Sequence, residues 1–545
     1  MALAPKGSGV GASEVSFRSE IPSSADMLED LPEELLRSVT LPVALRGLGK
    51  EWRQRDPSFG KWRPHLTMAQ TQRFDYFLSH DWGTSGWMKY FSLLIFFNSR
   101  ASALVTFVSS SLLGVLSGME LLPKTVWWLI LGQLVALVVL FFWQHLRDVF
   151  SRERLFVDSL CIPQHDEGLK SQCIYGLASF LKRSDTLLVL WSPRYCTRLW
   201  CMYELGCFLM KQKRAKHILF LPVQMSVLWL LCYLQVAAIF VTALIGQRVG
   251  NVFDWQEITG TLSLAAVILI QVLVLYPAYF YIMNSMLADM NQLPRLFRDF
   301  ELDRSECLCC SCQHRHPITL EELPCDRQLI YESLKHWSGE AGDIQTVFKT
   351  HLDEHVMPSV EQNFRSSALF VRPLMSAALV ASCPFICDFM SVEFTKLVRK
   401  MKGNSFRNAG LPVYVFFLSL CLVRCSLLLG RLGVRWKEHP RCAVLFQVLA
   451  FLCISQFLGM GYPLAVAVGS KGFKFTAINL LPFLLLCIVM TWSMCVYQRA
   501  LTSWSRMSLV KSKAAKKPAK KEVTVELNEI DGSICSVDSG STVGI

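Results

Sequence analysis

The chain has 545 residues and a formal net charge of +12; 52% of the residues are hydrophobic, only 18% are charged, and the mean hydropathy is +0.34. Soluble domains are usually about 45–50% apolar and about 25% charged, so this composition favours a membrane-embedded protein. It excludes collagen-like, coiled-coil and wholly disordered chains. The twenty cysteines, many of them in apolar runs, and an N-terminus without secretory character argue against an exported disulfide scaffold.

The first 70 residues are rich in Gly, Ser, Pro and charged residues. One short helix is predicted through Met27 to Arg37, with an N-cap near Ser24. The segment has little of the apolar periodicity that a core requires, so we expect a mostly flexible N-terminal arm.

The next segment, residues 71–224, is predicted to form an α/β domain. Four short apolar runs have strand character, and helical patterns at Ser171–Arg183 and Thr197–Lys211 separate the later ones. This alternation indicates a parallel sheet covered on both faces, in which ligands bind beyond the carboxyl ends of the strands. The predicted strands are Phe74–Ser79, Arg154–Asp158, Thr186–Ser192 and His217–Val223.

Four blocks of this domain resemble the successive signatures of a TIR domain, and their order implies a flavodoxin-like parallel sheet. The block that follows the second strand, Asp158–Asp166, is also similar to the related fungal HET domain. The resemblance covers about 150 of the 545 residues, and its Trp-Cys-x-x-Glu-Leu motif is the most specific part. The four blocks are Phe74–His80, Leu155–Asp158, Leu188–Tyr195 and Leu199–Leu205.

The chain departs from the TIR pattern in two places. A TIR domain joins its first two strands through one helix, whereas this connection contains two candidate membrane spans, Ala101–Met119 and Thr125–Gln144. We therefore expect a transmembrane hairpin at 101–144 inside the domain, which then sits flush on the bilayer. The family's fifth strand and last helix are either missing or supplied by residues 287–366, and an incomplete sheet leaves an edge that another element must cover.

The resemblance also implies an activity, because some TIR domains cleave NAD with a glutamate of the block that holds Glu204 here. A carboxylate suits this reaction, since breaking the nicotinamide–ribose bond builds oxocarbenium character that a nearby anion stabilises. Alternatively, Glu204 is a surface residue paired with Arg194 or Arg198. Asp81 disfavours a bound diphosphate. The residues expected at the NAD site are Ser79, His80, Trp82, Asp158, Arg194 and Tyr195.

Further apolar runs predict about eight membrane spans in total, because about 20 apolar residues cross a hydrocarbon core of about 30 Å. Two of them are weaker: Pro384 interrupts Pro373–Cys387, and Arg424 lies inside Leu411–Gly430. The others beyond the first hairpin are Met225–Gln247, Ile258–Met283, Cys442–Ser470 and Phe475–Gln498.

Basic residues near the spans predict the orientation. They gather at Lys211–Lys216, at Arg295 and Arg298, and between Lys511 and Lys521, so the α/β domain and the C-terminal tail should both be cytoplasmic. With eight spans the basic loop Lys396–Arg407 then lies on the non-cytoplasmic side, against the same rule. A re-entrant or interfacial segment around Pro384 would remove this conflict but would leave an odd number of spans elsewhere. The lysines from Lys511 to Lys521 are also expected to lie near anionic lipid, at about 1 kcal/mol per basic residue.

A cluster of cysteine and histidine residues follows the fourth predicted span. Its two-residue spacings, Cys307 with Cys310 or Cys309 with Cys312, are typical of a zinc knuckle, and a histidine or Cys325 can complete the tetrahedron. Free or palmitoylated thiols are the main alternative, and a disulfide is disfavoured in a reducing compartment. The candidate ligands are Cys307, Cys309, Cys310, Cys312, His314, His316 and Cys325.

Three functions remain open: a membrane signalling protein whose TIR-like domain associates with other such domains, a membrane-anchored NAD hydrolase, and a channel or transporter with a TIR-like regulatory domain. The first needs only the fold, and the expected partners are the lipid bilayer and other TIR-like domains, not nucleic acid. The predicted segments are the arm 1–70, the TIR-like domain 71–224 with its hairpin 101–144, a hairpin 225–286, the Cys/His-rich segment 287–366, a bundle of spans 367–498 and the tail 499–545.

Overall fold

The computed structural model describes most of the chain between residues 31 and 459. The described residues are 31–53, 66–123, 127–163, 166–212, 218–249, 266–315 without 268, then 322, 325–328, 330, 331 and 334, and further 343–354 without 353, 368–398, 405–434, 436 and 439–459. The predicted span Phe475–Gln498, the lysines from Lys511 to Lys521 and the candidate ligand His316 lie outside them.

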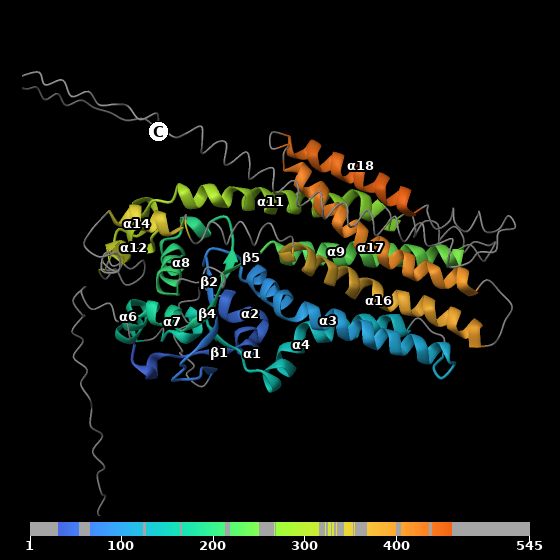
Figure 1. Ribbon diagram of the computed structural model, residues 1–545, viewed down its shortest axis with the longest axis horizontal. Helices are drawn as coiled ribbons and strands as arrows, with labels where there is room; N and C mark the ends of the chain where they lie inside the picture. The colour runs from blue at the N-terminus through green and yellow to red at the C-terminus, as the bar shows by residue number, and fades with distance from the viewer. Residues whose placement is uncertain are drawn as a thin grey trace, which may run out of the picture. The chain divides into compact units, whose positions relative to one another are not determined.

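A mixed five-stranded sheet organises the first part of the chain (Figure 1). Its order is β1-β3-β2-β4-β5; β1 runs antiparallel to β3, and the other neighbours are parallel. The register pairs Tyr76 with Leu155 and with Thr186, so the predicted pairing of the first two strands across the inserted hairpin is confirmed. The strands are β1 Val39–Thr40, β2 Phe74–His80, β3 Arg154–Phe156, β4 Ser184–Trp191 and β5 Ile218–Pro222.

The outer strand β1 comes from the segment that we predicted to be a flexible arm. Val39 is fully buried, and Leu31 packs so closely on Gly176 that a Cβ there would lie 2.2 Å from the Leu31 side chain. Residues 31–53 therefore belong to the sheet domain. The composition of the whole 70-residue segment concealed the short apolar run that carries β1. At the other edge of the sheet, Phe220 of β5 contacts Phe297 (ring centroids 6.4 Å apart).

Helices cover the sheet and position the strand ends. The predicted helix Ser171–Arg183 is two helices, α6 and α7, which meet at Gly176, and Phe180 of α7 packs on Phe74 and Phe156. The helix predicted at Thr197–Lys211 is α8. Elements in this part are η1 Glu33–Leu35, α1 Leu41–Ala44, α2 Arg46–Arg53, α5 Asp158–Cys161, α6 Glu167–Tyr175, α7 Leu177–Lys182, η4 Tyr195–Thr197 and α8 Leu199–Gln212.

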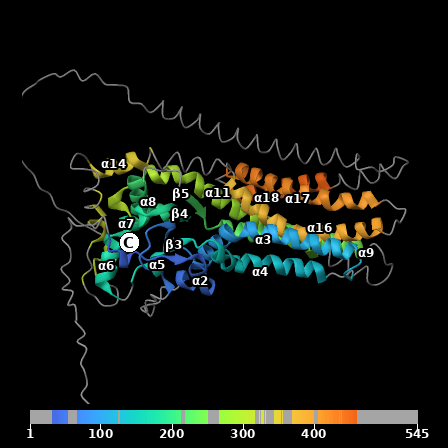
Figure 2. The ribbon, with the colours of Figure 1, turned by 60° about the horizontal axis from the view of Figure 1, so that its bottom comes forward.

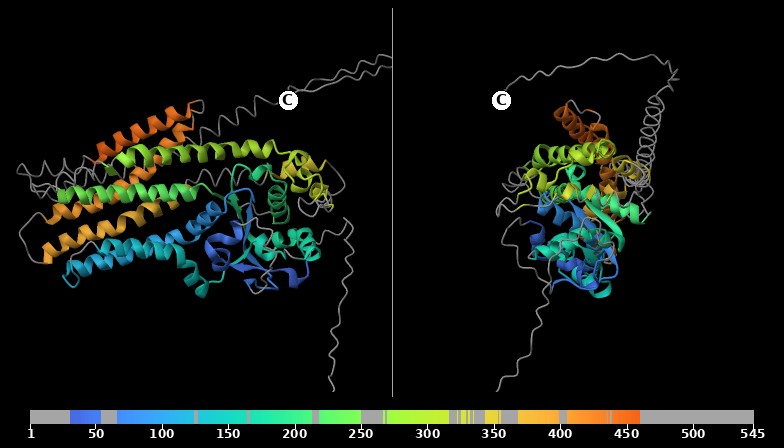
Figure 3. Two further views of the ribbon diagram at one scale, coloured as in Figure 1. Left: turned by 180° about the vertical axis from the view of Figure 1, so that it is seen from behind. Right: turned by 90° about the vertical axis from the view of Figure 1, so that its left-hand side faces the viewer.

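Three helices in the described residues are long and apolar enough to cross a membrane: α3, α4 and the Phe370–Asp388 part of α16. They run side by side in Figures 2 and 3. Two shorter apolar stretches, Met225–Val241 and Pro440–Ser455, belong to α9 and α18. The bounds are α3 Gly86–Gly118, α4 Trp127–Phe150, α9 Met225–Val249, the π-helix η6 Gln271–Leu275, α11 Tyr276–Arg298, η7 Leu302–Arg304, α12 Leu308–Ser311, α14 Ile344–His351, α16 Ala368–Val398, α17 Ser405–Gly433 and α18 Pro440–Gly459.

The first apolar helix begins earlier than predicted. We expected it at Ala101, whereas α3 starts at Gly86 and carries Lys89 and Asn98 into the interior. The Asn98 amide donates to the Leu140 carbonyl (2.8 Å) and to Gln144, and the Phe97 ring packs edge to face on Tyr76 at 5.4 Å. One continuous helix therefore joins the sheet to the apolar helices. The predicted total of eight spans stays a prediction.

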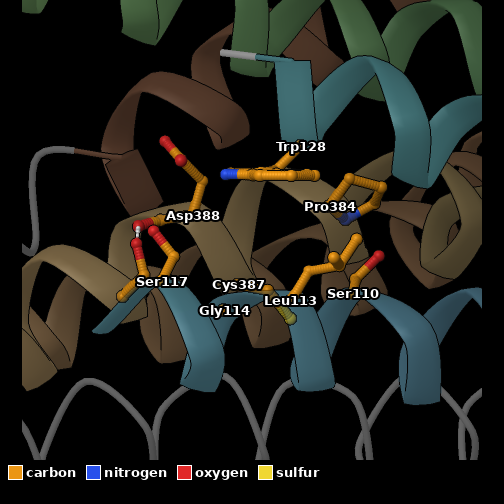
Figure 4. A pocket seen from close by; sticks show the side chains of 9 residues that line it. Ser110, Leu113, Gly114, Ser117, Trp128, Pro384, Cys387 and Asp388 are labelled. Atoms are coloured by element: carbon orange, nitrogen blue, oxygen red, sulfur yellow. Dashed lines mark hydrogen bonds between the residues drawn. The ribbon is translucent and has the colours of Figure 1, made fainter. Parts of the chain in front are cut away.

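Small residues let α3, α4 and α16 pack closely. A Cβ on Gly114 would lie 2.7 Å from the Cys387 carbonyl oxygen, and one on Gly132 would lie 2.9 Å from Pro384. Figure 4 shows the small cavity between these helices, with Trp128 beside Pro384 and Asp388. Its volume of about 10 Å³ is no larger than one water molecule needs.

Gly132→Leu should destabilise the protein by about 1–3 kcal/mol, because the added side chain must displace the rigid Pro384 ring. Leu134→Ala is the control, since Leu134 lies on the same helix and is 54% exposed. The measurement is the midpoint of thermal unfolding in detergent. Equal midpoints for the two variants would contradict the close packing of α4 on α16.

Candidate functional site

A cavity of about 200 Å³ opens at the carboxyl ends of the parallel strands β2 and β3. Its wall combines two carboxylic acids, three basic residue types and two indole rings with an apolar floor. This is the position at which ligands bind in open parallel sheets. The lining residues are His80, Trp82, Asp158, Ile162, Lys170, Ile174, Leu177, Arg198, Trp200, Cys201 and Glu204.

Glu204 lies in this cavity, on the second turn of α8. The Ser79 hydroxyl at the end of β2 donates to its carboxylate. Burial raises the pKa of Glu204 to about 8; the nearby Asp158 carboxylate adds to the rise, and the Ser79 hydrogen bond opposes it. The uncharged acid is therefore the main form at pH 7.

The structure does not pair Glu204 with Arg194 or Arg198, the partners expected if Glu204 were a surface residue. Arg194 and Arg198 both pair with Glu306, at 2.8 Å and 3.5 Å, and Arg198 also lies 3.6 Å from Asp81. Glu204 therefore lines the cavity and does not lie on an exposed face of α8.

Tyr195 contacts Ser79 on the side that faces the protein interior. It is fully buried, its hydroxyl oxygen lies 2.6 Å from Ser79 Oγ, and it donates to the Cys201 carbonyl (3.2 Å). A buried phenol in this position fixes Ser79 and has no face open to a ligand. Tyr195 and the exposed Arg194, both expected at the site, lie outside the cavity lining.

A second carboxylate faces the cavity at the start of α5. Burial raises the pKa of Asp158 to about 6, against the stabilising backbone N–H of Ser159 and the positive charge of Lys89. Burial, together with Lys89, also lowers the pKa of His80 well below its usual value, so this imidazole is neutral at pH 7. Two acids with separated pKa values in one cavity are typical of acid–base sites.

Two aromatic rings and two cations complete the wall. Trp82 packs on His80 at 5.3 Å and keeps 41% of its surface exposed, and Lys89 Nζ lies 5.8 Å from the Trp82 ring centroid. The cations Lys170 and Arg198 also line the cavity. Asp81, which we expected to repel a diphosphate, is buried and accepts from the Gly83 N–H (3.0 Å) and the Thr84 hydroxyl (3.2 Å).

The sequence signals found four of these lining residues (His80, Trp82, Asp158 and Glu204) and missed most of the rest. Trp200 was within reach, since it lies four residues before Glu204 on one helical face. Lys170 and Arg198 carried no comparable signal, because their helices meet the strand ends only in the folded chain.

A second cluster follows η7. The donor atoms of Cys309, Cys310, His314 and Cys325 lie within 4.8 Å of one another, and those of Cys307, Cys309 and Asp326 form an overlapping set. Cys310 Sγ is 3.9 Å from Cys309 Sγ, 3.9 Å from Cys325 Sγ and 3.6 Å from His314 Nε2. This cluster can hold a metal ion. The predicted ligand Cys312 is not part of either set.

The thiol of Cys325 has a lowered pKa. Its burial opposes ionisation, but hydrogen bonds from the backbone of Gln328 and Arg327 and from the His314 side chain lower its pKa to about 7. Thiolate is the form that binds metals. All seventeen described cysteines are unbridged, and the 2.9 Å between the Cys307 and Cys309 sulfurs is far longer than a disulfide bond.

The fold and site together define an α/β domain with a mixed five-stranded sheet and a cavity at its strand ends that contains two carboxylic acids, joined to apolar helices and to a Cys/His cluster. Comparisons with protein-family models, with curated proteins and with solved structures give no match for this chain.

Proposed function

We propose that the protein is a membrane-anchored enzyme that cleaves the nicotinamide–ribose bond of NAD, with Glu204 as its catalytic carboxylate. The observation that carries this proposal is the position of Glu204 in the cavity beside His80 and Trp82. The order of the four parallel strands, β3-β2-β4-β5, supports the TIR-like reading, because it is the beginning of the flavodoxin-like order.

The chemistry of the wall suits a cationic leaving group. A positively charged nicotinamide ring beside Glu204 favours the carboxylate over the neutral acid, and the resulting anion stabilises positive charge on the ribose as the bond breaks. Asp158 is already largely ionised at pH 7 and faces the same space. Trp82 offers a ring face for stacking.

The dinucleotide extends beyond the cavity in this proposal. The cavity has a volume of about 200 Å³, which is below the range of about 300–1,000 Å³ that is usual for pockets that bind drug-sized ligands. In this proposal the cavity therefore encloses only the reacting nicotinamide and ribose. Lys170 and Arg198 in the wall supply positive charge toward the diphosphate in place of the predicted Arg194.

The apolar helices serve as the membrane anchor. With α3, α4 and α16 in a bilayer, the sheet domain lies at the membrane surface. The basic residues near the predicted spans favour the cytoplasmic side for this domain and for the C-terminal tail. A transport role has less support from the described residues. One cavity between α3, α4 and α16 has a volume of about 10 Å³, and another, lined by Cys232, Tyr279 and Phe451 among others, has about 30 Å³.

The metal that best fits the Cys/His cluster is zinc. Tetrahedral zinc with sulfur ligands at about 2.3 Å and nitrogen ligands at about 2.0 Å requires sulfur–sulfur separations of about 3.8 Å and sulfur–nitrogen separations of about 3.5 Å. The 3.9 Å and 3.6 Å around Cys310 agree with those values. We therefore assign Cys309, Cys310, His314 and Cys325 as its ligands in this proposal.

Purified full-length protein in nanodiscs should release nicotinamide from NAD, and release should rise with protein density if TIR-like domains must associate for activity. NADH is the matched control substrate, since its reduced ring is uncharged and leaves poorly. Chromatographic detection of nicotinamide is the measurement. The absence of release at every density would leave the signalling role, in which the domain associates with its own kind and needs only the fold.

A further inference from the structure

The Cys/His cluster is joined to the wall of the cavity by two acidic residues that flank its ligands. Glu306 directly precedes Cys307, and Asp326 directly follows Cys325. Each of them holds a residue that lines the cavity.

Glu306 holds the turn that precedes α8. Its N–H donates to the Thr197 carbonyl (2.7 Å), its carbonyl accepts from the Leu199 N–H (3.2 Å), and its carboxylate accepts from the Thr197 hydroxyl (3.1 Å). The same carboxylate pairs with Arg198, which lines the cavity. The hydrogen bond from Arg194, supported by those from Thr197 and Arg198, lowers the pKa of Glu306 against a slight effect of burial, so Glu306 is ionised at neutral pH.

Asp326 holds the first turn of α8. The Trp200 indole N–H donates to its carboxylate (3.1 Å), and Trp200 lines the cavity four residues from Glu204. On its other side, Asp326 contacts the cluster: its N–H donates to Cys309 Sγ (3.3 Å), and its carboxylate accepts from the Cys307 thiol (3.6 Å). Asp326 thus touches both the cluster and the cavity wall.

The backbone of the cluster is strained in a way that brings the ligands together. Gln313 and His314 both have positive φ, at 53° and 58°. Non-glycine residues persist in this conformation only where the surrounding structure fixes them, and the turn that they form brings the His314 ring to Cys310. The regular structure between residues 302 and 315 amounts to the single turns η7 and α12. Besides these turns, the segment is held by the backbone hydrogen bonds of Glu306 and by side-chain contacts within the cluster.

We infer that the metal centre is a positioning element for the cavity: zinc on Cys309, Cys310, His314 and Cys325 fixes Glu306 and Asp326, which hold Arg198 and Trp200 in the wall beside Glu204. The inference deepens the proposed function, since it rests on the cavity being the active site. Loss of the metal loosens the first turns of α8 and widens the wall. The reaction then becomes dependent on zinc supply and on the redox state of these thiols.

The first test measures the metal content of the protein and does not require NAD. Full-length protein in nanodiscs should contain about one zinc per chain by elemental analysis, and Cys310→Ser should lose it. Cys312→Ser is the matched control, because this neighbouring cysteine lies outside both ligand sets. Absence of zinc from the wild-type protein would overturn the inference.

Hydrogen exchange followed by mass spectrometry then measures the coupling between the metal centre and the first turns of α8. Removal of zinc, by Cys310→Ser or by a chelator on the wild-type protein, should speed exchange across residues 199–204 about tenfold, the factor expected when one charge-assisted hydrogen bond is lost. Exchange in β4 serves as the reference for an intact fold. Unchanged exchange in 199–204 after zinc has left would overturn the coupling, and this outcome does not depend on any activity.

Glu306→Gln tests the connection with the metal in place. It removes the charge that holds Arg198 and should raise the KM for NAD about tenfold while changing kcat less, because Arg198 contacts the part of the substrate outside the reacting bond. Zinc content should stay unchanged. Equal losses in kcat and kcat/KM would contradict a positioning role. A protein that shows the exchange effect but releases no nicotinamide would refute the proposed function alone.

Discussion

Glu204→Gln should lower the rate of nicotinamide release at least about 100-fold, the lower range for loss of a positioned acid–base or electrostatic group. The substitution keeps the size of the side chain and its hydrogen bond to Ser79, but an amide cannot become the anion that stabilises the ribose cation. NAD binding should change little, since the amide fills the same space. The measurement is the single-turnover rate at saturating NAD.

Glu153→Gln is the control for this variant. Glu153 is another largely buried glutamate of the sheet domain, where it pairs with Arg147 away from the cavity lining. Its loss should leave kcat within about twofold of the wild-type value. If the domain acts only by association, Glu204→Gln should also leave signalling and self-association intact, and changes near Pro163 to Gly168 should disrupt them instead.

The stability of Glu204→Gln provides a check on the fold. Since burial raises the pKa of Glu204 to about 8, above the 4.5 of an exposed glutamate, the folded protein binds more protons than the unfolded chain between these values. Wild-type stability should therefore fall as the pH rises from about 5 to about 8. The variant lacks this group, so it should lose this part of the pH dependence and be at least as stable as the wild type near pH 9.

The sheet could be predicted from the sequence because its strands are continuous apolar runs. The predicted Phe74–Ser79 and Thr186–Ser192 lie within one residue or two of β2 and β4. The short strand Val39–Thr40 could not be predicted in this way, since two residues show no alternation and its partner Leu155 is more than a hundred positions away. Pairing across the sheet, rather than local propensity, determines that strand.

The beginning of α3 was predicted wrongly for a related reason. The charged and amide residues Lys89, Asn98 and Arg100 kept the beginning of α3 out of the predicted span Ala101–Met119. The folded domain supplies partners for the first two of them: Lys89 donates to the Asp81 carbonyl (3.3 Å) and Asn98 to the Leu140 carbonyl. Hydropathy measures how well a residue is accommodated in a lipid bilayer, not how well it is accommodated in a protein interior that offers hydrogen-bond partners. The same limit explains the site. Glu204 could be found from its motif, whereas the place of Lys170 depends on how α6 packs.

The activity should rise with pH. The carboxylate of Glu204 is the active form, and in the free enzyme its pKa is raised to about 8 by burial and by Asp158. Because kcat/KM reports the free enzyme, it should increase about tenfold per pH unit below this value, or about 50-fold between pH 6 and pH 8, and then level off. The profile of kcat should lie at lower pH, since bound NAD brings a positive ring that favours the carboxylate.

Asp158→Asn tests the cause of this profile. It removes a negative charge that raises the pKa of Glu204, so the rise in kcat/KM should move to lower pH, while the plateau falls if the Asp158 carboxylate also stabilises the ribose cation. Residual activity of Glu204→Gln should be independent of pH over the same range. A wild-type kcat/KM that falls from pH 6 to pH 8 would mean that the protonated acid is the active form, and it would remove Glu204 from the role of stabilising anion.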